Sequence, residues 1–110
     1  MTARFELHKN DRGQFHFSLR NADGGVLLVS EGYASKASAE NGIASVKKNC
    51  IVAERFEKRV ADDGRFYFNL HAANHQVIGT SPMFKSAEQR DAAIAAIHAE
   101  ADKAAVDDRA

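Results

Sequence analysis

The 110-residue sequence has one cysteine, one proline and no tryptophan, and its charges cancel. A single cysteine, Cys50, excludes an intrachain disulfide and a metal site built from cysteines. It falls near the end of a helical pattern, where we interpret it as a small packing residue and not as a nucleophile. The 15 basic and 15 acidic residues leave no net charge, which argues against a dedicated nucleic-acid or membrane-surface binder.

The sequence also has no long apolar run. None approaches the roughly 20 residues that span a bilayer, and the first residues lead directly into a strand-like pattern without an apolar signal region. We therefore expect a soluble, cytoplasmic protein with no membrane partner. A phosphate-binding glycine loop, a nucleophile elbow and a helical His-x-x-x-His motif are all absent, so the sequence predicts no enzyme, no cofactor and no metal.

The strongest feature that is present is an internal repeat. Residues 4–47 align without a gap with residues 55–98, at an offset of 51 residues. The clearest pair of segments is Gly13 to Leu19, GQFHFSL, and Gly64 to Leu70, GRFYFNL. Each places Phe, Phe and Leu at alternate positions, which is typical of a strand with one buried face.

The pattern predicts three strands and a helix in each repeat. In the first repeat we expect strands over about 4–9 and 14–20, a third strand from 26 to about 30 or 33, and a helix over 36–49. In the second repeat we expect strands over about 54–60, 65–71 and 76–84, and a helix over 87–101. Pro82 cannot donate to a sheet ladder, so the third strand of the second repeat should bulge or lie at an edge there.

Three segments, Gly13 to Leu19, Ser35 to Asn49 and Gly64 to Ser81, resemble the YegP-like family of small bacterial proteins, and the resemblance covers essentially the whole chain. It implies two tandem β-β-β-α units that share one sheet. It also implies that the strand after each helix crosses to the other unit. Residues 104–108 would then form a short last strand beside the first repeat, whereas these residues taken alone suggest a frayed tail. The family is a domain of unknown function, so it implies no catalytic residues.

We therefore predict an α+β fold, with one mainly antiparallel sheet of about six strands and two helices packed on one face. A single domain, residues 1–110, would contain both repeats, about 4–53 and 54–110. A lone repeat has too little core to be stable by itself. Because the tandem copy supplies what a single unit would gain by dimerising, we expect a monomer.

The polar side of the predicted sheet is the candidate interaction face. Pairing around the first hairpin would place His8 opposite His16, two imidazoles at the distance of a possible metal site. The second repeat has Arg59 and Tyr67 at the equivalent positions, so we interpret the histidines as a solvated pair. The candidate face consists of His8, His16, Arg20, Arg59, Tyr67, Asn69 and His71.

Three functions are compatible with this face. The leading hypothesis is a small non-enzymatic module that binds an unknown protein partner through the face or through a strand edge. The alternative is weak nucleic-acid binding, in which Tyr67 and His16 stack on bases and Lys47 and Lys48 add positive charge. A metal-dependent or other enzyme comes third. Mixed charges and a single clear aromatic residue on the face favour the protein partner.

Overall fold

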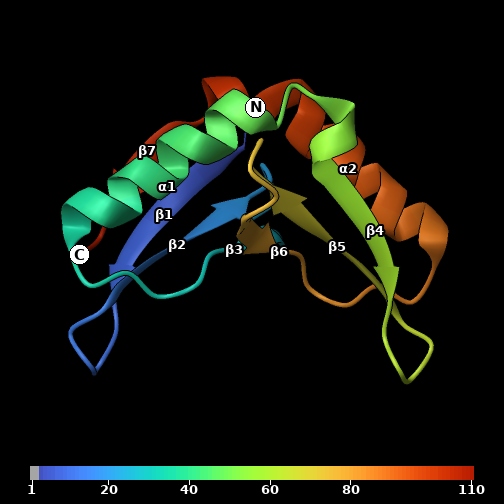
Figure 1. Cartoon of the computed structure of the whole chain (residues 1–110), viewed down its shortest axis with the longest axis horizontal. Coiled ribbons are helices and arrows are strands. Elements are labelled where there is room, and N and C mark those ends of the chain that lie inside the picture. The colour runs from blue at the N-terminus through green and yellow to red at the C-terminus, as the bar shows by residue number, and fades with distance from the viewer. Residues whose placement is uncertain (1–2) are drawn as a thin grey trace.

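The structure is a computed structural model that describes residues 3–110. Its elements follow the repeat (Figure 1). The first repeat contains β1 (Arg4–Lys9), β2 (Phe15–Arg20), β3 (Val26–Val29) and α1 (Lys36–Asn49). The second contains β4 (Phe56–Val60), β5 (Phe66–His71), β6 (Val77–Thr80) and α2 (Ala87–Glu100). Two 3-10 turns follow the helices, η1 (Ala53–Arg55) and η2 (Ala101–Lys103), and β7 (Ala105–Asp108) comes last.

Local sequence explains where the helices begin and the hairpins turn. The hydroxyl oxygens of Ser35 and Ser86 each accept a hydrogen bond from a backbone N–H of the first helical turn, as N-cap residues do. Gly24 turns the β2–β3 hairpin with φ of +89°, and His75 occupies the equivalent position with φ of +68°. A non-glycine residue in this region is strained, so the second repeat retains strain that glycine relieves in the first.

All seven strands form one sheet in the order β4-β5-β6-β3-β2-β1-β7. Adjacent strands are antiparallel, except that β7 runs parallel to β1. The third strands of the two repeats meet at the centre, where Val29 pairs with Thr80. These two residues are equivalent in the repeat, so an approximate two-fold axis passes through their pairing. The predicted shared sheet is confirmed, with seven strands in place of about six.

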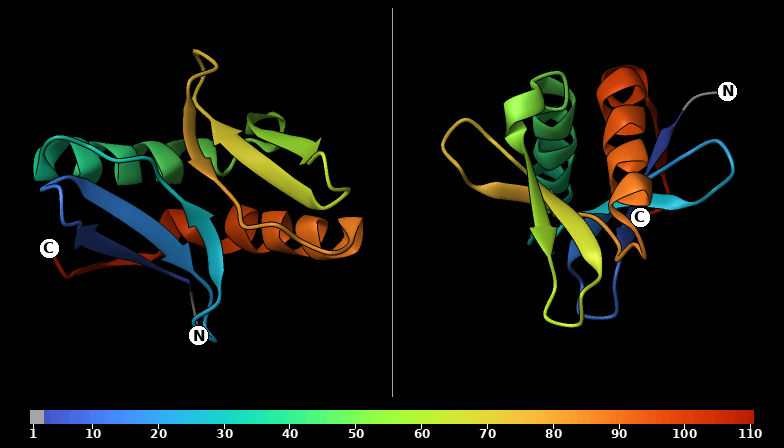
Figure 2. Two further views of the ribbon diagram at one scale, coloured as in Figure 1. Left: turned by 90° about the horizontal axis from the view of Figure 1, so that it is seen from below. Right: turned by 90° about the vertical axis from the view of Figure 1, so that its right-hand side faces the viewer.

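After each helix the chain crosses to the other half of the molecule (Figures 1 and 2). From the end of α1, η1 leads to β4 at the far edge of the sheet. From the end of α2, η2 leads back to β7, which pairs with β1 at the opposite edge. The last strand that the family resemblance implied is therefore present, over Ala105–Asp108.

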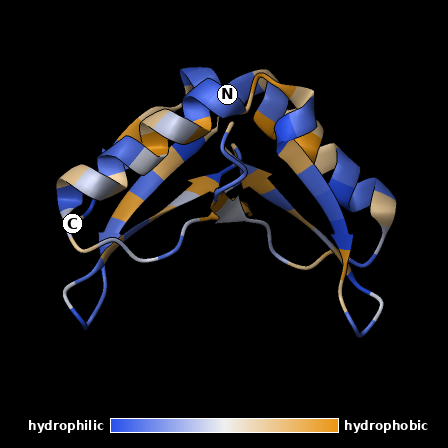
Figure 3. Cartoon of the chain, in the orientation of Figure 1, coloured by the Kyte–Doolittle hydropathy of each residue, from blue (hydrophilic) through white to orange (hydrophobic). Residues whose placement is uncertain are grey.

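The hydrophobic core lies between the helices and one face of the sheet. Hydrophobic and hydrophilic residues alternate along β1 in Figure 3, and Phe5 of that strand is fully buried. Its ring meets Phe17 edge-on, with the ring centroids 5.9 Å apart. Phe56 and Phe68 repeat this arrangement in the other half at 5.8 Å. Cys50 is fully buried in the same core, as expected for a packing residue.

The third strands are shorter than predicted. Both end early. Beyond them, the backbone N–H groups of Ser30 and Ser81 still donate to the carbonyls of Phe17 and Phe68, and isolated bridges join Tyr33 to Phe15 and Phe84 to Phe66. The strand β6 is internal and ends at Thr80, before Pro82, so the expected bulge or edge position at this proline is wrong. The ladder is interrupted in the same way in both repeats, because the hydroxyls of Ser30 and Ser81 accept from the N–H groups of Phe17 and Phe68 in place of a backbone carbonyl. No helix within residues 3–110 is long and apolar enough to cross a membrane.

Candidate functional site

One row of paired residues crosses the whole helix-free face of the sheet. Each member lies opposite the next on the neighbouring strand, and because side chains alternate along a strand, all of them belong to one face. From β7 to β4 the row reads Asp107, Glu6, Ser18, Val29, Thr80, Asn69 and Glu57. The pairing of Val29 with Thr80 therefore divides the face into two equivalent halves.

In the first half the side chains gather around Glu6, which is only 3% exposed. Its carboxylate accepts hydrogen bonds from Arg20 Nε at 2.9 Å and Arg4 Nε at 3.2 Å. His8 Nε2 lies 3.3 Å from the same group, and a guanidinium nitrogen of Arg109 lies at 3.6 Å. Burial alone would raise the pKa of Glu6, but the guanidinium groups, Arg109 and Arg20 foremost, outweigh it and lower the pKa. This cluster ties β1, β2 and the C-terminal segment together.

His8 and His16 lie opposite each other as predicted. Their rings stack with centroids 5.4 Å apart. Burial, with the neighbouring His8 ring as a second cause, lowers the pKa of His16 and favours its neutral form. No group of three or more His, Cys, Asp or Glu side chains with metal-site geometry occurs within residues 3–110.

The second half of the face has weaker interactions. Glu57, the equivalent of Glu6, is well exposed and bonds Arg59 on its own strand. Asn69 donates from its amide to the Thr80 hydroxyl at 2.9 Å. His71 is buried, and its ring lies 5.5 Å from that of His75. The charge cluster of the first half thus has no counterpart of equal burial here.

The structure therefore places all seven predicted residues on one face but not in one site. They form two groups separated by the central pair: His8, His16 and Arg20 on one side, and Arg59, Tyr67, Asn69 and His71 on the other. Arg20 is already engaged, because it bonds Glu6 and donates to the carbonyl of Gly24 at 2.8 Å.

The sharpest difference between the halves is at the two edges of the sheet. β1 and β4 are equivalent strands, and β7 covers the outer edge of β1. Within the described chain, no strand covers the outer edge of β4. The backbone nitrogen of Arg109 donates to the carbonyl of Leu7 at 2.8 Å, so Leu7 presents its backbone groups outward to the covering segment. By equivalence and alternation, Phe56, Lys58 and Val60 present theirs at the open edge of β4.

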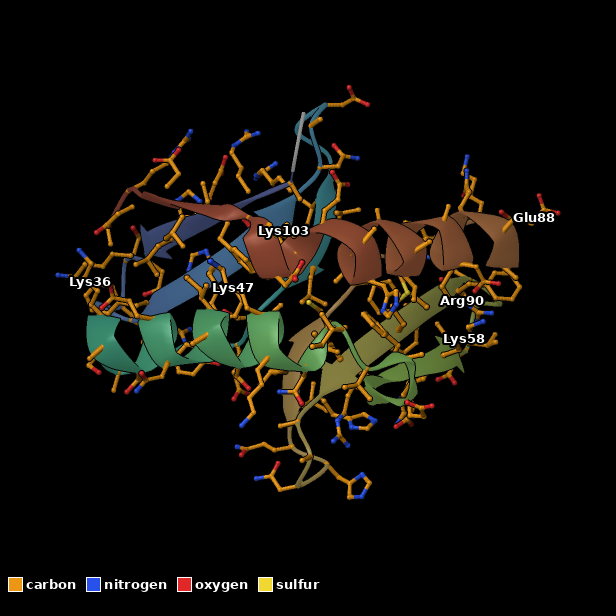
Figure 4. All side chains as sticks on the ribbon, turned by 90° about the horizontal axis from the view of Figure 1, so that it is seen from above. Lys36, Lys47, Lys58, Glu88, Arg90 and Lys103 are labelled. Carbon is orange, nitrogen blue, oxygen red and sulfur yellow. The ribbon has the colours of Figure 1, made fainter. Side chains whose placement is uncertain are left out.

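Paired charges surround this open edge. Lys58 and Arg59 have half-exposed side chains, and Lys58 Nζ lies 3.3 Å from Asp91 of α2. Arg90 is 9% exposed, with its guanidinium 5.2 Å from the ring centroid of Phe66. Figure 4 shows Lys58 and Arg90 at the same end of the molecule.

Arg90 also donates to the backbone carbonyl of Arg59 at 3.3 Å, so it fixes α2 to β4. Sequence reasoning missed Arg90 and Lys58. The repeat could have pointed to Arg90, because it occupies the position equivalent to Ala39 of the first helix, which is buried. An arginine at a buried helix position is unusual.

A family model and the relatives found by sequence comparison agree on one protein family. The family model described as "Domain of unknown function (DUF1508)" matches residues 10–57 and again 61–108. The UPF0339 protein YegP of Escherichia coli K12 is 50% identical over 99 residues, 90% of each chain. A UPF0339 protein of Shewanella oneidensis is 45% identical over 97 residues, 88% of each chain.

Two solved structures have the same fold as this chain. The solution NMR structure of yegP from E. coli, described as a protein of unknown function, is 48% identical with a TM-score of 0.92, covering 99% of this chain and 94% of that one. The solution NMR structure of a UPF0339 protein from S. oneidensis is 42% identical with a TM-score of 0.92, covering 98% and 92%.

Proposed function

This chain belongs to the DUF1508 family, for which no function is established, and we propose that it is a non-enzymatic binding module that accepts an extended acidic peptide segment as an added strand beside β4. One observation carries the proposal. The outer edge of β1 is covered by β7, whereas the equivalent edge of β4 carries no strand among residues 3–110. The pairing of β7 with β1 is therefore an example, within the same molecule, of the strand addition that we propose at β4. Strand addition to an open sheet edge is a general mode of peptide recognition.

The side chains along β4 indicate which segment would bind. Lys58 and Arg59 form exposed ion pairs with Asp91 and Glu57, and each can exchange that partner for a carboxylate of the bound segment. Val60, 59% exposed, provides apolar surface. Lysine on an edge strand discourages pairing with neutral or basic strands. The same lysine favours a strand with carboxylates, so the edge would select by charge.

The strand β7 shows what such a segment looks like. It carries Asp107 and Asp108, and Asp108 bonds Lys36 of α1. It runs parallel to β1, in register from Arg4 opposite Ala105. We expect a partner segment to run parallel to β4 with acidic residues near Lys58 and Arg59.

NMR titration tests this proposal directly. A blocked peptide with the sequence AAVDDRA, that of residues 104–110, is added to the ¹⁵N-labelled protein. We expect amide shifts along Phe56–Val60, and weaker binding of AAVNNRA, in which both carboxylates are replaced by amides. Shifts confined to β1 and β7 would mean that the peptide only exchanges with the chain's own last strand, and would contradict the proposal.

A pair of variants at one position separates backbone pairing from charge. Lys58→Pro removes an outward N–H that the β4–β5 ladder does not use, so it should abolish binding while the fold persists. Lys58→Gln keeps the N–H and should weaken binding only about two- to fivefold, the range of one exposed ion pair. Equal binding by both variants would show that the edge is not the site. Unchanged amide shifts in β1 and β2 verify the fold of each variant.

Nucleic-acid binding, the alternative function, has less support. It required Lys47 and Lys48 to act together with the helix-free face. Lys47 Nζ lies 5.8 Å from the ring centroid of Phe5, a core residue on the helix side of the sheet. Lys47 and the helix-free face therefore lie on opposite sides of the sheet.

A further inference from the structure

A groove lies on the helix side of the molecule, between α2 of the second repeat and the β2–β3 hairpin of the first. Its volume is about 620 Å³, within the range of small-molecule sites. The apolar lining includes Val26, Leu27, Met83, Phe84, Ala92 and Ala96. Met83 is 41% exposed, and a flexible thioether at a groove adapts to ligands of different shape.

The other half has a second groove of half this volume, nearer the end of its helix, and only Ser45 and Ala72 of its lining are equivalent to residues that line the larger groove. It lies between α1 and the β5–β6 hairpin, measures about 310 Å³, and is lined in part by Ser45 and Lys48. The helix residues equivalent to Ala92 and Ala96 are Asn41 and Ser45, which are larger and polar. The small side chains of Ala92 and Ala96 therefore give the larger groove room and an apolar wall that Asn41 and Ser45 would not give at the equivalent place in α1.

The polar side chains that line the larger groove, Asn21, Lys85 and Gln89, offer mainly hydrogen-bond donors. The side-chain oxygen of Asn21 already accepts from the backbone N–H groups of Asp23 at 3.0 Å and Gly25 at 2.9 Å. The side-chain oxygen of Gln89 accepts from the backbone N–H of Lys85 at 3.1 Å. These bonds fix the orientation of both amides, since only oxygen can accept from N–H. The two amide NH₂ groups and the Lys85 ammonium remain as donors at the rim.

We propose that this groove binds a small amphipathic anion, in which an apolar chain lies along α2 and a carboxylate meets the donors at the rim. Donors of this kind bond a carboxylate and cannot bond an ammonium group. The site is distinct from the open edge of β4, so the proposal does not depend on the strand-addition function. Either proposal can fail without the other.

The test compares three probes that share one apolar chain: decanoate, decanol and decylammonium, each below its micelle concentration. Binding to the ¹⁵N-labelled protein is followed through amide shifts. We expect decanoate to bind with shifts at Val26, Met83 and Gln89, decanol to bind about two- to fivefold more weakly because one ion pair is missing, and decylammonium to bind weakest. Equal binding of all three, or shifts centred on Ser45 and Lys48, would overturn the proposal. So would the absence of binding at millimolar decanoate.

Matched variants in α1 serve as controls for variants at the larger groove. Ala92→Leu fills the larger groove at an exposed helix position that tolerates leucine, and should weaken decanoate binding at least about tenfold. Asn41→Leu places the same side chain at the equivalent position of α1 and should leave binding unchanged. Lys85→Gln should remove the preference for decanoate over decanol, whereas Lys48→Gln should not. If Ala92→Leu binds decanoate as the unmodified chain does, the ligand is not in this groove.

Discussion

The side chain of Leu28 fills the space above Gly79, the residue at the equivalent position of the second repeat. A Cβ atom on Gly79 would lie 2.7 Å from Cγ and Cδ2 of Leu28. Both residues are next to the central pair, Val29 and Thr80. Close to a two-fold axis, equivalent side chains point into the same space, so only one of them can be large. Leucine in one repeat and glycine in the other resolve this conflict.

Gly79→Ala should therefore lower the free energy of unfolding by about 1–3 kcal/mol, the usual cost of overpacking a core. Urea unfolding measures this loss. Leu28→Ala by itself should also destabilise, because it leaves a cavity. In the double variant the two losses should be less than additive, since each change relieves the other. Additive losses would show that Leu28 and Gly79 do not compete for space.

Glu6 should make stability depend on acid pH. Its folded pKa is lowered although burial acts to raise it, because arginines, Arg109 foremost, stabilise the carboxylate. A lowered folded pKa adds stability that is fully present above the ordinary glutamate pKa and is lost as the pH falls through the lowered value. Glu6→Gln should cost about 1.5–3 kcal/mol at neutral pH, as for hydrogen bonds to a charged group, and little once Glu6 is protonated.

Glu57→Gln is the matched control for this measurement. Glu57 is the repeat equivalent of Glu6 and its side chain is 46% exposed. We expect its replacement to change stability by less than about 0.5 kcal/mol at any pH. Urea unfolding across the acid range compares the two variants. A cost for Glu6→Gln that does not decrease at low pH would rule out the charge cluster as its origin.

The chain should be a monomer despite the open edge of β4. Two copies pairing antiparallel about the middle of β4 would set Lys58 of one chain directly opposite Lys58 of the other, and like charges directly opposite are destabilising. Sedimentation equilibrium at micromolar concentrations measures the mass. A stable dimer would show either edge pairing or an exchange of β7 between chains, and Lys58→Pro would distinguish them because it disrupts only the former.

The two repeats should unfold together. Phe5 and Phe68 belong to one continuous hydrophobic cluster that includes side chains from both helices, and neither repeat has a core of its own. We expect one calorimetric transition for the whole chain. A fragment of residues 1–53 should be unfolded or dimeric, because it lacks β6 beside β3. Two transitions, or a folded monomeric fragment, would contradict the shared core.

The repeat and its period-two pattern were readable because they are local properties of the chain. Phe15, Phe17 and Leu19 alternate within one strand, and Ser35 lies at the right distance before a helical stripe. Such signals depend on neighbours two to four residues apart, so they predicted the elements and the buried face without knowledge of the rest. The position of His8 opposite His16 followed in the same way, because a short hairpin sets its own register.

The candidate site was less predictable, because exposure depends on residues far apart in the sequence. Glu6, Asn69 and His71 fell on the predicted face but are buried there, since strands and side chains from other segments close around them. Arg90 lies within a helical pattern, and only the folded chain shows that it bonds the carbonyl of Arg59. The groove beside Ala92 likewise exists only because α2 packs near a hairpin of the other repeat.

The sequence by itself determined the repeat, the two helices, the hairpin strands and the face that each of these strands buries, because alternation and capping act within a few residues. It did not determine β7, since residues 104–108 taken alone suggest a frayed tail. The tertiary structure decided which edge is open. After α1 the chain forms β4 at the place equivalent to β1, but after α2 that place is already filled by β1, so the C-terminal residues add outside it as β7. This order of strands results from which segments meet in space. It leaves β4, and not its equivalent β1, with unpaired backbone groups.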